Sequence, residues 1–240
     1  MGISAPELPL NRGETVADDL AGMGSFFIDP QGAAQRVHNR WFWVGPLVIF
    51  SIVSLIASYV MMPMAQHVME TAPLPANTSP EQYQHGMEIG MKIQRMAMYF
   101  APVIAALIFA IEAGVLLLMS AVLSVRARFL ELFNLVAGCN LIQVLSAIAV
   151  VVILKAKGEV STAAELRPAL GLDIFMHDSS SKVLTGIAGY FTPFEIWWVV
   201  MMVLTYSLAF RVTKGKAFTA IAPLMVLGLL LRIVGAVFQR

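Results

Sequence analysis

The chain has 240 residues, of which 58% are hydrophobic and only 13% are charged, and its net charge at pH 7 is +1. Soluble domains are about 45–50% apolar and about 25% charged, so this composition indicates a polytopic integral membrane protein. A net charge this close to zero offers no basic surface for nucleic acid. The single cysteine, Cys139, excludes an intramolecular disulfide and a thiolate metal cluster.

The N-terminal part of the chain is polar before it becomes aromatic. Residues 1–24 contain several prolines and glycines, and we predict a flexible tail there. Asp29 and Pro30 then favour the start of a short amphipathic helix, because aspartate caps a helix N-terminus and proline suits its first turn. The aromatic run 41–43 is typical of the belt between water and lipid. The short helix is therefore expected to lead directly into the first membrane span.

Five apolar runs follow, and each reaches the ~20 residues that a helix needs to cross a bilayer. Backbone polar groups in lipid must be satisfied internally, so these runs are predicted to be helices. The predicted fold is an all-α polytopic membrane protein with five transmembrane helices and a short N-terminal amphipathic helix, in which residues 25–238 form the membrane domain. The predicted spans are approximately 42–64, 97–125, 132–154, 190–210 and 217–238.

The basic residues indicate an orientation. Loops 126–131 and 211–216 are very short and rich in Arg and Lys, and short loops are where the positive-inside rule acts. We therefore predict a cytosolic N-terminus, with the longer polar loops 65–96 and 155–189 on the opposite side. In the simplest interpretation these basic residues only set the topology, and in another they form a surface for anionic lipid. They are Arg36, Arg40, Arg126, Arg128, Arg211, Lys214 and Lys216.

Three segments of the chain resemble the Yip family (Ypt-interacting proteins) in its bacterial form. They are Phe26-Phe27 with Asp29-Pro30 and Trp41…Gly45-Pro46-Leu47, then Arg128-Phe129-Leu130-Glu131-Leu132-Phe133-Asn134, and finally Leu170–Asp173 with Phe191-Thr192-Pro193-Phe194-Glu195-Ile196-Trp197. The likeness covers about residues 24–238. The chain departs from the family pattern at Pro193, where an aspartate is often found, and in the length of loop 65–96.

The resemblance implies a five-span protein of the bacterial inner membrane. Eukaryotic relatives are associated with vesicle trafficking and small GTPases, whereas bacterial relatives largely have no assigned activity. Extending the trafficking role to this chain would rest on fold-level analogy alone.

Three ionisable residues fall within or near the predicted spans, where charge is costly and often functional. Glu195 and Arg232 are expected to lie about 8 Å and about 9 Å from the outer boundary, on consecutive antiparallel helices. We predict that they form an intramembrane ion pair. Glu112 lies deeper, at about 22 Å. Its predicted neighbours are Asn140 and Gln143, with which it would form a mid-membrane polar cluster.

Glu112 has three competing interpretations: a structural role, a proton-coupled or ion-binding role, and assembly with a partner helix. The chain contains no HExxH, P-loop, GxSxG or dinucleotide-binding motif, so we predict neither an enzyme nor a cofactor. The first functional hypothesis is a scaffold or membrane-organising protein that binds lipids, other membrane proteins or itself. Such a protein should leave small-residue helix faces uncovered, such as Ala106, Ala110 and Gly114. The alternative is a small channel or transporter that uses the polar cluster.

A third hypothesis comes from the uneven distribution of methionine. Eight of the 15 methionines lie in a short stretch together with two histidines. These residues are Met61, Met62, Met64, Met69, Met87, Met91, Met96, Met98, His67 and His85. Thioether and imidazole groups suit Cu(I), which would indicate periplasmic metal handling. Methionine also packs adaptably at helix ends, and no tight repeated motif is present, so we predict no metal site.

Overall fold

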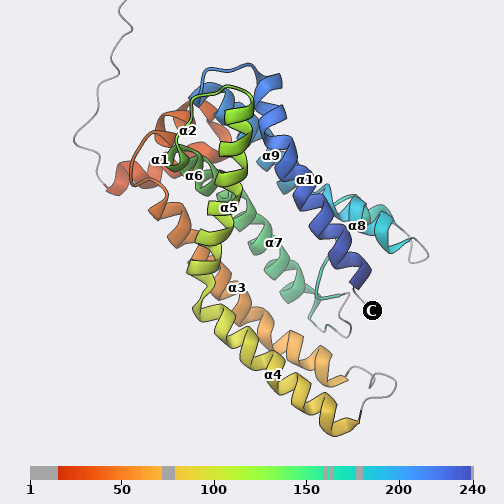
Figure 1. The fold of residues 1–240 in the computed structure, drawn as a ribbon. Helices are drawn as coiled ribbons and strands as arrows, with labels where there is room; N and C mark the ends of the chain where they lie inside the picture. The colour runs from red at the N-terminus through yellow and green to blue at the C-terminus, as the bar shows by residue number, and fades with distance from the viewer. Residues whose placement is uncertain are drawn as a thin grey trace, which may run out of the picture.

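The computed structural model describes residues 16–71, 79–158, 160, 162, 165–176 and 181–238, and every regular element in these ranges is a helix (Figure 1). The elements are α1 (Val16–Ile28), α2 (Pro30–Val37), α3 (Val44–Thr71), α4 (Pro80–Tyr99), α5 (Ala101–Val122), α6 (Phe129–Cys139), α7 (Leu141–Lys157), the 3₁₀ helix η1 (Leu172–Phe175), α8 (Lys182–Tyr190), α9 (Pro193–Ala209) and α10 (Lys214–Phe238). The predicted all-α class is confirmed.

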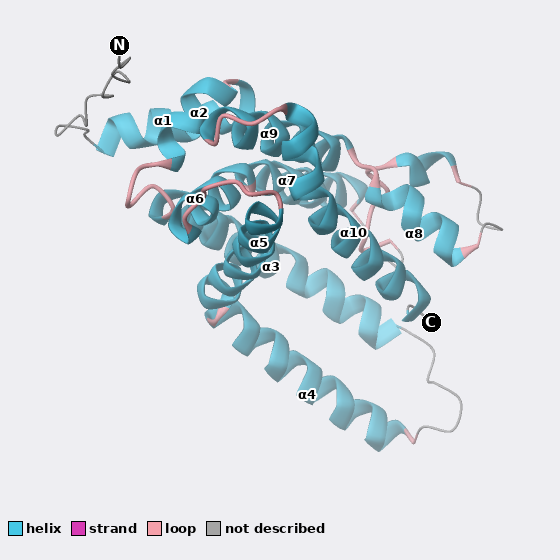
Figure 2. Cartoon of the chain, turned by 45° about the horizontal axis from the view of Figure 1, so that its top comes forward, coloured by secondary structure: helices cyan, strands magenta, loops and turns pink. Residues whose placement is uncertain are grey.

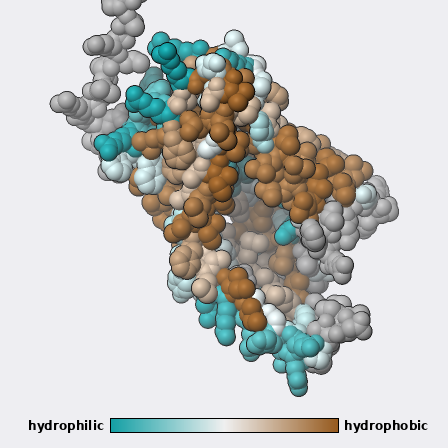
Figure 3. Space-filling model, in the orientation of Figure 1, coloured by the Kyte–Doolittle hydropathy of each residue, from teal (hydrophilic) through white to brown (hydrophobic). Residues whose placement is uncertain are grey.

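The described helices provide four spans, or up to five when a bent pair is counted as one. Helix α3, helix α5, the joined segment 129–157 and helix α10 are each long and apolar enough to cross a membrane. Helices α8 and α9 are long and apolar enough to cross a membrane only when they are taken together, and a bend of 53° separates them. Figure 3 shows hydrophobic residues along the long helices and hydrophilic residues at the two ends of the molecule. This distribution is the one expected of a multi-pass membrane protein.

The apolar pair of α8 and α9 begins before the predicted fourth span of 190–210. The prediction of 190–210 covers α9 but leaves out α8, which belongs to the apolar pair that starts at Val183. Pro193 separates the two helices because proline lacks the N–H that would continue the hydrogen-bonding pattern of α8. Glu195 is therefore about 18 Å along the pair from Val183 rather than about 8 Å from its beginning.

The predicted polar loop 65–96 is wrong, because most of this stretch is helical. Helix α3 continues through Pro63 to Thr71, and α4 returns beside it (Figure 1). Ser79 and Gln82 form a reciprocal capping box at the start of α4, with N···O distances of 3.2 and 3.3 Å. The Tyr83 hydroxyl then donates a hydrogen bond of 2.7 Å to the Met69 carbonyl and joins the two helices. The cap at Ser79 was the sequence signal for this helix.

Three methionines of this hairpin have identified packing or hydrogen-bonding partners. Met61 and Met64 lie against a small cluster of buried residues that includes Leu154 on α7. Gln66 Nε2 donates to Met91 Sδ at 3.5 Å, which links α3 to α4. Within the described ranges, no group of three or more His, Cys, Asp or Glu side chains is placed to hold a metal ion.

Residues 1–15 of the predicted flexible tail lie outside the described residues, and the rest of the predicted tail is helical. Helix α1 begins at Val16, and Met23 and Phe26 are both buried. Helices α1 and α2 lie across one end of the helix bundle, where α2 packs on α6 and α9 (Figure 2). The two short helices therefore form part of the main hydrophobic core, and the predicted boundary at residue 24 falls inside α1.

Candidate functional site

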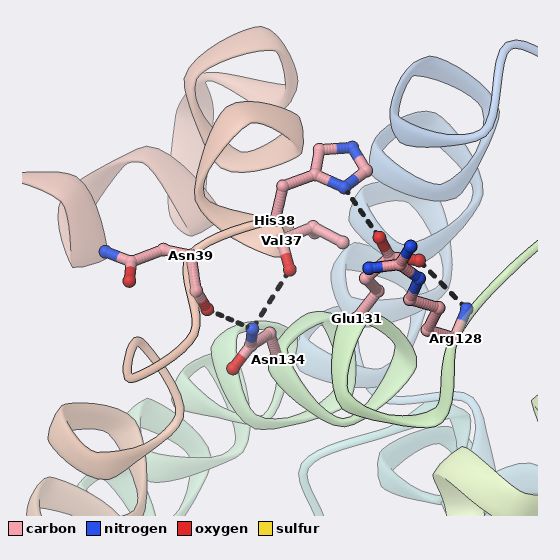
Figure 4. Close-up of polar contacts among 6 residues, drawn as sticks. All are labelled: Val37, His38, Asn39, Arg128, Glu131 and Asn134. Atoms are coloured by element: carbon pink, nitrogen blue, oxygen red, sulfur yellow. Dashed lines mark hydrogen bonds and ion pairs between the residues drawn. The ribbon is translucent and has the colours of Figure 1, made fainter. Parts of the chain in front are cut away.

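The end of the bundle that carries α1, α2 and the start of α6 is built around Asn134 on α6, and we call it the junction. The Asn134 side chain is 1% exposed. Its Nδ2 donates hydrogen bonds to the Val37 carbonyl at 2.9 Å and to the Asn39 carbonyl at 2.5 Å (Figure 4). Its Oδ1 accepts a hydrogen bond of 3.0 Å from the Trp43 backbone N–H. One amide thus satisfies three backbone groups of the connection between α2 and α3, which its irregular conformation would otherwise leave without partners.

A second link joins the end of α2 to the start of α6. His38 Nδ1 lies 3.1 Å from Glu131 Oε1, and the two side chains face each other (Figure 4). The other carboxylate oxygen, Glu131 Oε2, accepts a hydrogen bond of 2.9 Å from the Arg128 backbone N–H. Glu131 therefore caps its own helix and holds the neighbouring segment at the same time.

Aromatic packing completes the junction. Phe26 is fully buried and stacks on Phe42 with 5.1 Å between ring centroids. It lies so close to Gly138 that a Cβ at this position would be only 2.3–2.5 Å from three atoms of its ring. The Trp197 indole N–H donates a hydrogen bond of 2.8 Å to the Phe27 carbonyl. Because Gly138 has no side chain, Phe26 of α1 can pack directly against α6.

A pocket of about 230 Å³ opens at the surface of the junction. Its walls come from the α2–α3 connection and from the start of α6. The lining residues are Val37, His38, Asn39, Arg40, Arg128, Leu130, Glu131 and Asn134. The pocket thus combines two guanidinium groups and an imidazole with one carboxylate that is already hydrogen-bonded.

The structure brings together most of the predicted mid-membrane residues, but in a different arrangement of partners. Asn140 Nδ2 donates to Glu112 Oε2 at 2.9 Å. Gln143 Nε2 instead donates to Glu195 Oε2 at 3.0 Å. Because Glu112 and Glu195 are close enough to interact electrostatically, the two carboxyl–amide pairs form one group. The hydrogen bond between Gln143 and Glu195 was not predicted, because the expected depths placed Gln143 beside Glu112.

Arg232 lies beside this group without a direct ion pair to Glu195. Both residues are in the described part of the chain, and the two side chains interact only through longer-range electrostatics. Arg232 is exposed and also flanks Asp173 of η1. A Cβ on Gly189 would lie 3.2 Å from Arg232 Nη2 and 2.9 Å from Asp173 Oδ2. Arg232 and Asp173 therefore both lie close to Gly189, and this proximity to Asp173 was not predicted.

The comparisons with known proteins agree with this architecture. The family model described as Yip1 domain matches residues 23–234. The chain belongs to the Yip1 domain family. A search of curated proteins found no match, and a search of solved structures found none. The match covers α2 to α9 completely, together with the end of α1 and most of α10, so the junction and the group of carboxyl–amide pairs both lie inside the Yip1 domain.

The junction residues of the Yip1 domain were not proposed as a site from the sequence. The segments that resemble the family did contain them, since Phe26, Asn134 and Trp197 each lie in a different one. The contacts among these segments join residues 95 and 170 positions apart in the chain. A buried amide inside an apolar run was the available signal, because such a group requires a polar partner. The identity of that partner could come only from the folded structure.

Proposed function

We propose that this Yip1 domain protein is a non-enzymatic scaffold or membrane-organising protein that binds other membrane proteins or lipids. The observation that supports the proposal is the junction. It holds α1 and α2 rigidly on the end of the bundle and leaves Trp41, 64% exposed, beside an open pocket. A rigid surface of this kind is suited to binding, because little conformational entropy is lost when a partner docks.

In this proposal the junction faces the cytosol of a bacterial cell, and the protein lies in the inner membrane. The short α5–α6 and α9–α10 connections carry Arg126, Arg128 and Arg211, and Lys214 begins α10. The rings of His38 and Phe210 pack edge to face with 6.3 Å between their centroids, so the end of α9 lies at the junction as well. Basic residues in short loops at one end of the molecule support an inward orientation of that end.

The test is photo-crosslinking in the native membrane. A photoreactive amino acid replaces Trp41 at the junction, and a matched variant carries it at Ile56, which is 57% exposed on α3. The proposal expects one protein, either another membrane protein or a second copy, to crosslink at Trp41 in near-stoichiometric yield and not at Ile56. If both positions crosslink to the same mixture of proteins, the junction is not a specific binding surface and the proposal is rejected. If Trp41 crosslinks only to lipid, binding to another protein is rejected and only the lipid-binding part of the proposal remains.

A second candidate function is a small channel or transporter, and one observation favours it. Two carboxyl groups, Glu112 and Glu195, lie together within the spans and are held by amides. Carboxyl groups in such positions commonly mark ion or proton pathways. Flux into liposomes containing the purified protein, compared with the Glu112→Gln variant, tests this alternative. Carboxyl-dependent flux together with no partner at Trp41 would favour the transporter.

A further inference from the structure

We propose that the junction pocket binds the phosphate group of an anionic phospholipid. The inference rests on the proposed function, because it names the ligand class that the junction would hold as a membrane-organising surface. The ligand chemistry is a phosphate oxyanion, and the source is a lipid headgroup in the leaflet next to the junction.

The charges of the pocket favour an anion. Arg40 and Arg128 both line it, both are exposed, and neither forms an ion pair within the part of the chain that the structure describes. The one carboxylate in the pocket, Glu131, already uses both oxygens, one toward His38 and the other toward the Arg128 backbone N–H. The two guanidinium groups therefore remain available, and guanidinium groups match phosphate oxygens with paired N–H donors.

The frame of the pocket is fixed before any ligand arrives. Asn134, which forms part of the lining, is buried and holds the Val37 and Asn39 carbonyls on one wall. The contact between His38 and Glu131 ties that wall to the start of α6. An anion would enter a site whose backbone is already ordered, so binding would cost mainly the ordering of the two arginine side chains.

The surroundings favour a lipid over free phosphate. The Arg40 guanidinium carbon lies 5.4 Å from the centre of the Trp41 ring. Trp41 itself is exposed, as are Phe129 at 44% and Leu130 at 38% on the other side of the pocket. Exposed aromatic and aliphatic side chains beside cationic groups are typical of the level where headgroups meet acyl chains. Such residues would contact the glycerol and upper acyl region while the arginines hold the phosphate.

The test measures lipid binding by the purified full-length chain in detergent, using native mass spectrometry. The probes are phosphatidylglycerol, phosphatidylcholine as the zwitterionic comparison, and inorganic phosphate without lipid. The pocket variant is Arg40→Gln/Arg128→Gln. The matched control is Arg126→Gln/Lys214→Gln, which removes the same charge from exposed positions outside the pocket lining. Thermal unfolding checks that both variants remain folded.

The wild-type protein should prefer phosphatidylglycerol to phosphatidylcholine. The pocket variant should bind phosphatidylglycerol about 30-fold more weakly, whereas the control should change little. Restoring the charge with Arg40→Lys/Arg128→Lys should recover only part of the binding, because lysine lacks the paired N–H donors of a guanidinium group. Equal losses in the pocket variant and the control would overturn the proposal, because a diffuse charge effect would then explain the binding.

Two further outcomes separate this proposal from its competitors. If inorganic phosphate alone binds as tightly as the lipid, the lipid assignment is wrong and the pocket is a site for a free anion. If the pocket variant keeps full lipid binding while the Trp41 crosslink to a protein persists, the lipid proposal fails and the scaffold proposal survives. Pocket-dependent lipid binding without any protein crosslink at Trp41 or Ile56 sustains the lipid site and counts against a protein scaffold.

Discussion

Replacing Asn134 by leucine should destabilise the junction and lower the free energy of unfolding. The substitution keeps a side chain of similar size but removes the two donors that serve Val37 and Asn39 and the acceptor that serves Trp43. An unsatisfied buried polar group costs about 1–3 kcal/mol. Water can reach part of this surface through the adjoining pocket, so the three losses should not add in full. The expected decrease in the free energy of unfolding is about 2–4 kcal/mol.

Equilibrium unfolding in mixed detergent micelles measures this change, and tryptophan fluorescence reports it because Trp43 and Trp197 both lie at the junction. The matched control is Gln35→Leu, the same change from amide to leucine on the exposed surface of α2. It should change the stability by less than about 0.5 kcal/mol. If Asn134→Leu unfolds as the wild type does, within about 0.5 kcal/mol, the amide does not hold the junction together and the reasoning is refuted.

Two further substitutions test the packing and the mid-membrane group. Gly138→Ala should destabilise the protein by about 1–3 kcal/mol, because the new Cβ would overlap the ring of Phe26. Gly114→Ala, where a Cβ meets no atom within 4 Å, should be neutral or stabilising by up to about 1 kcal/mol in the same unfolding assay. A double-mutant cycle with Glu112→Leu and Asn140→Leu should give a coupling energy of about 0.5–2 kcal/mol, and additive effects would show that the observed hydrogen bond contributes nothing.

Most of the architecture could be predicted from the sequence, because the strongest signals were long apolar runs. A bilayer requires runs of this length to form helices, so the spans were recognisable without knowledge of their packing. The N-cap at Asp29 was also predictable, and the structure shows its side chain accepting a hydrogen bond of 3.1 Å from the Gln31 backbone N–H. Short-range rules of this kind depend on a few neighbouring residues and therefore transfer well to a new sequence.

The sequence was misleading where the polarity of a segment did not match its secondary structure. The stretch 65–96 is polar enough to suggest a loop, but α4 needs little apolar surface because, among the described helices, it packs mainly against α3 and α5. The predicted span 190–210 leaves out α8, because the break at Pro193 divides one apolar stretch into two helices. The hydrogen bond from Gln143 to Glu195 was not predicted, because the depth of Glu195 was counted from residue 190. Depth estimates are only as good as the helix start from which they are counted.

Amide side chains form hydrogen bonds with buried or partly buried polar groups in two regions of this protein. Asn134 satisfies backbone groups at the junction, while Asn140 and Gln143 satisfy carboxyl groups deeper in the spans. Asn140 also lies at the break between α6 and α7, so the donor to Glu112 comes from the point where the two helices of the joined segment 129–157 meet. A carboxyl group held in this way has a structural reason to exist without any transported ion.

The distinction between structure and transport therefore depends on what Glu112→Gln changes. Glutamine keeps an oxygen that can accept from Asn140 but cannot release a proton. A purely structural Glu112 would tolerate this substitution in the unfolding assay and would leave the Trp41 crosslink intact. A carboxyl that carries protons or ions would also leave stability unchanged, but flux through the reconstituted protein would be lost. The comparison of stability with flux in this one variant separates the two roles that the position of Glu112 allows.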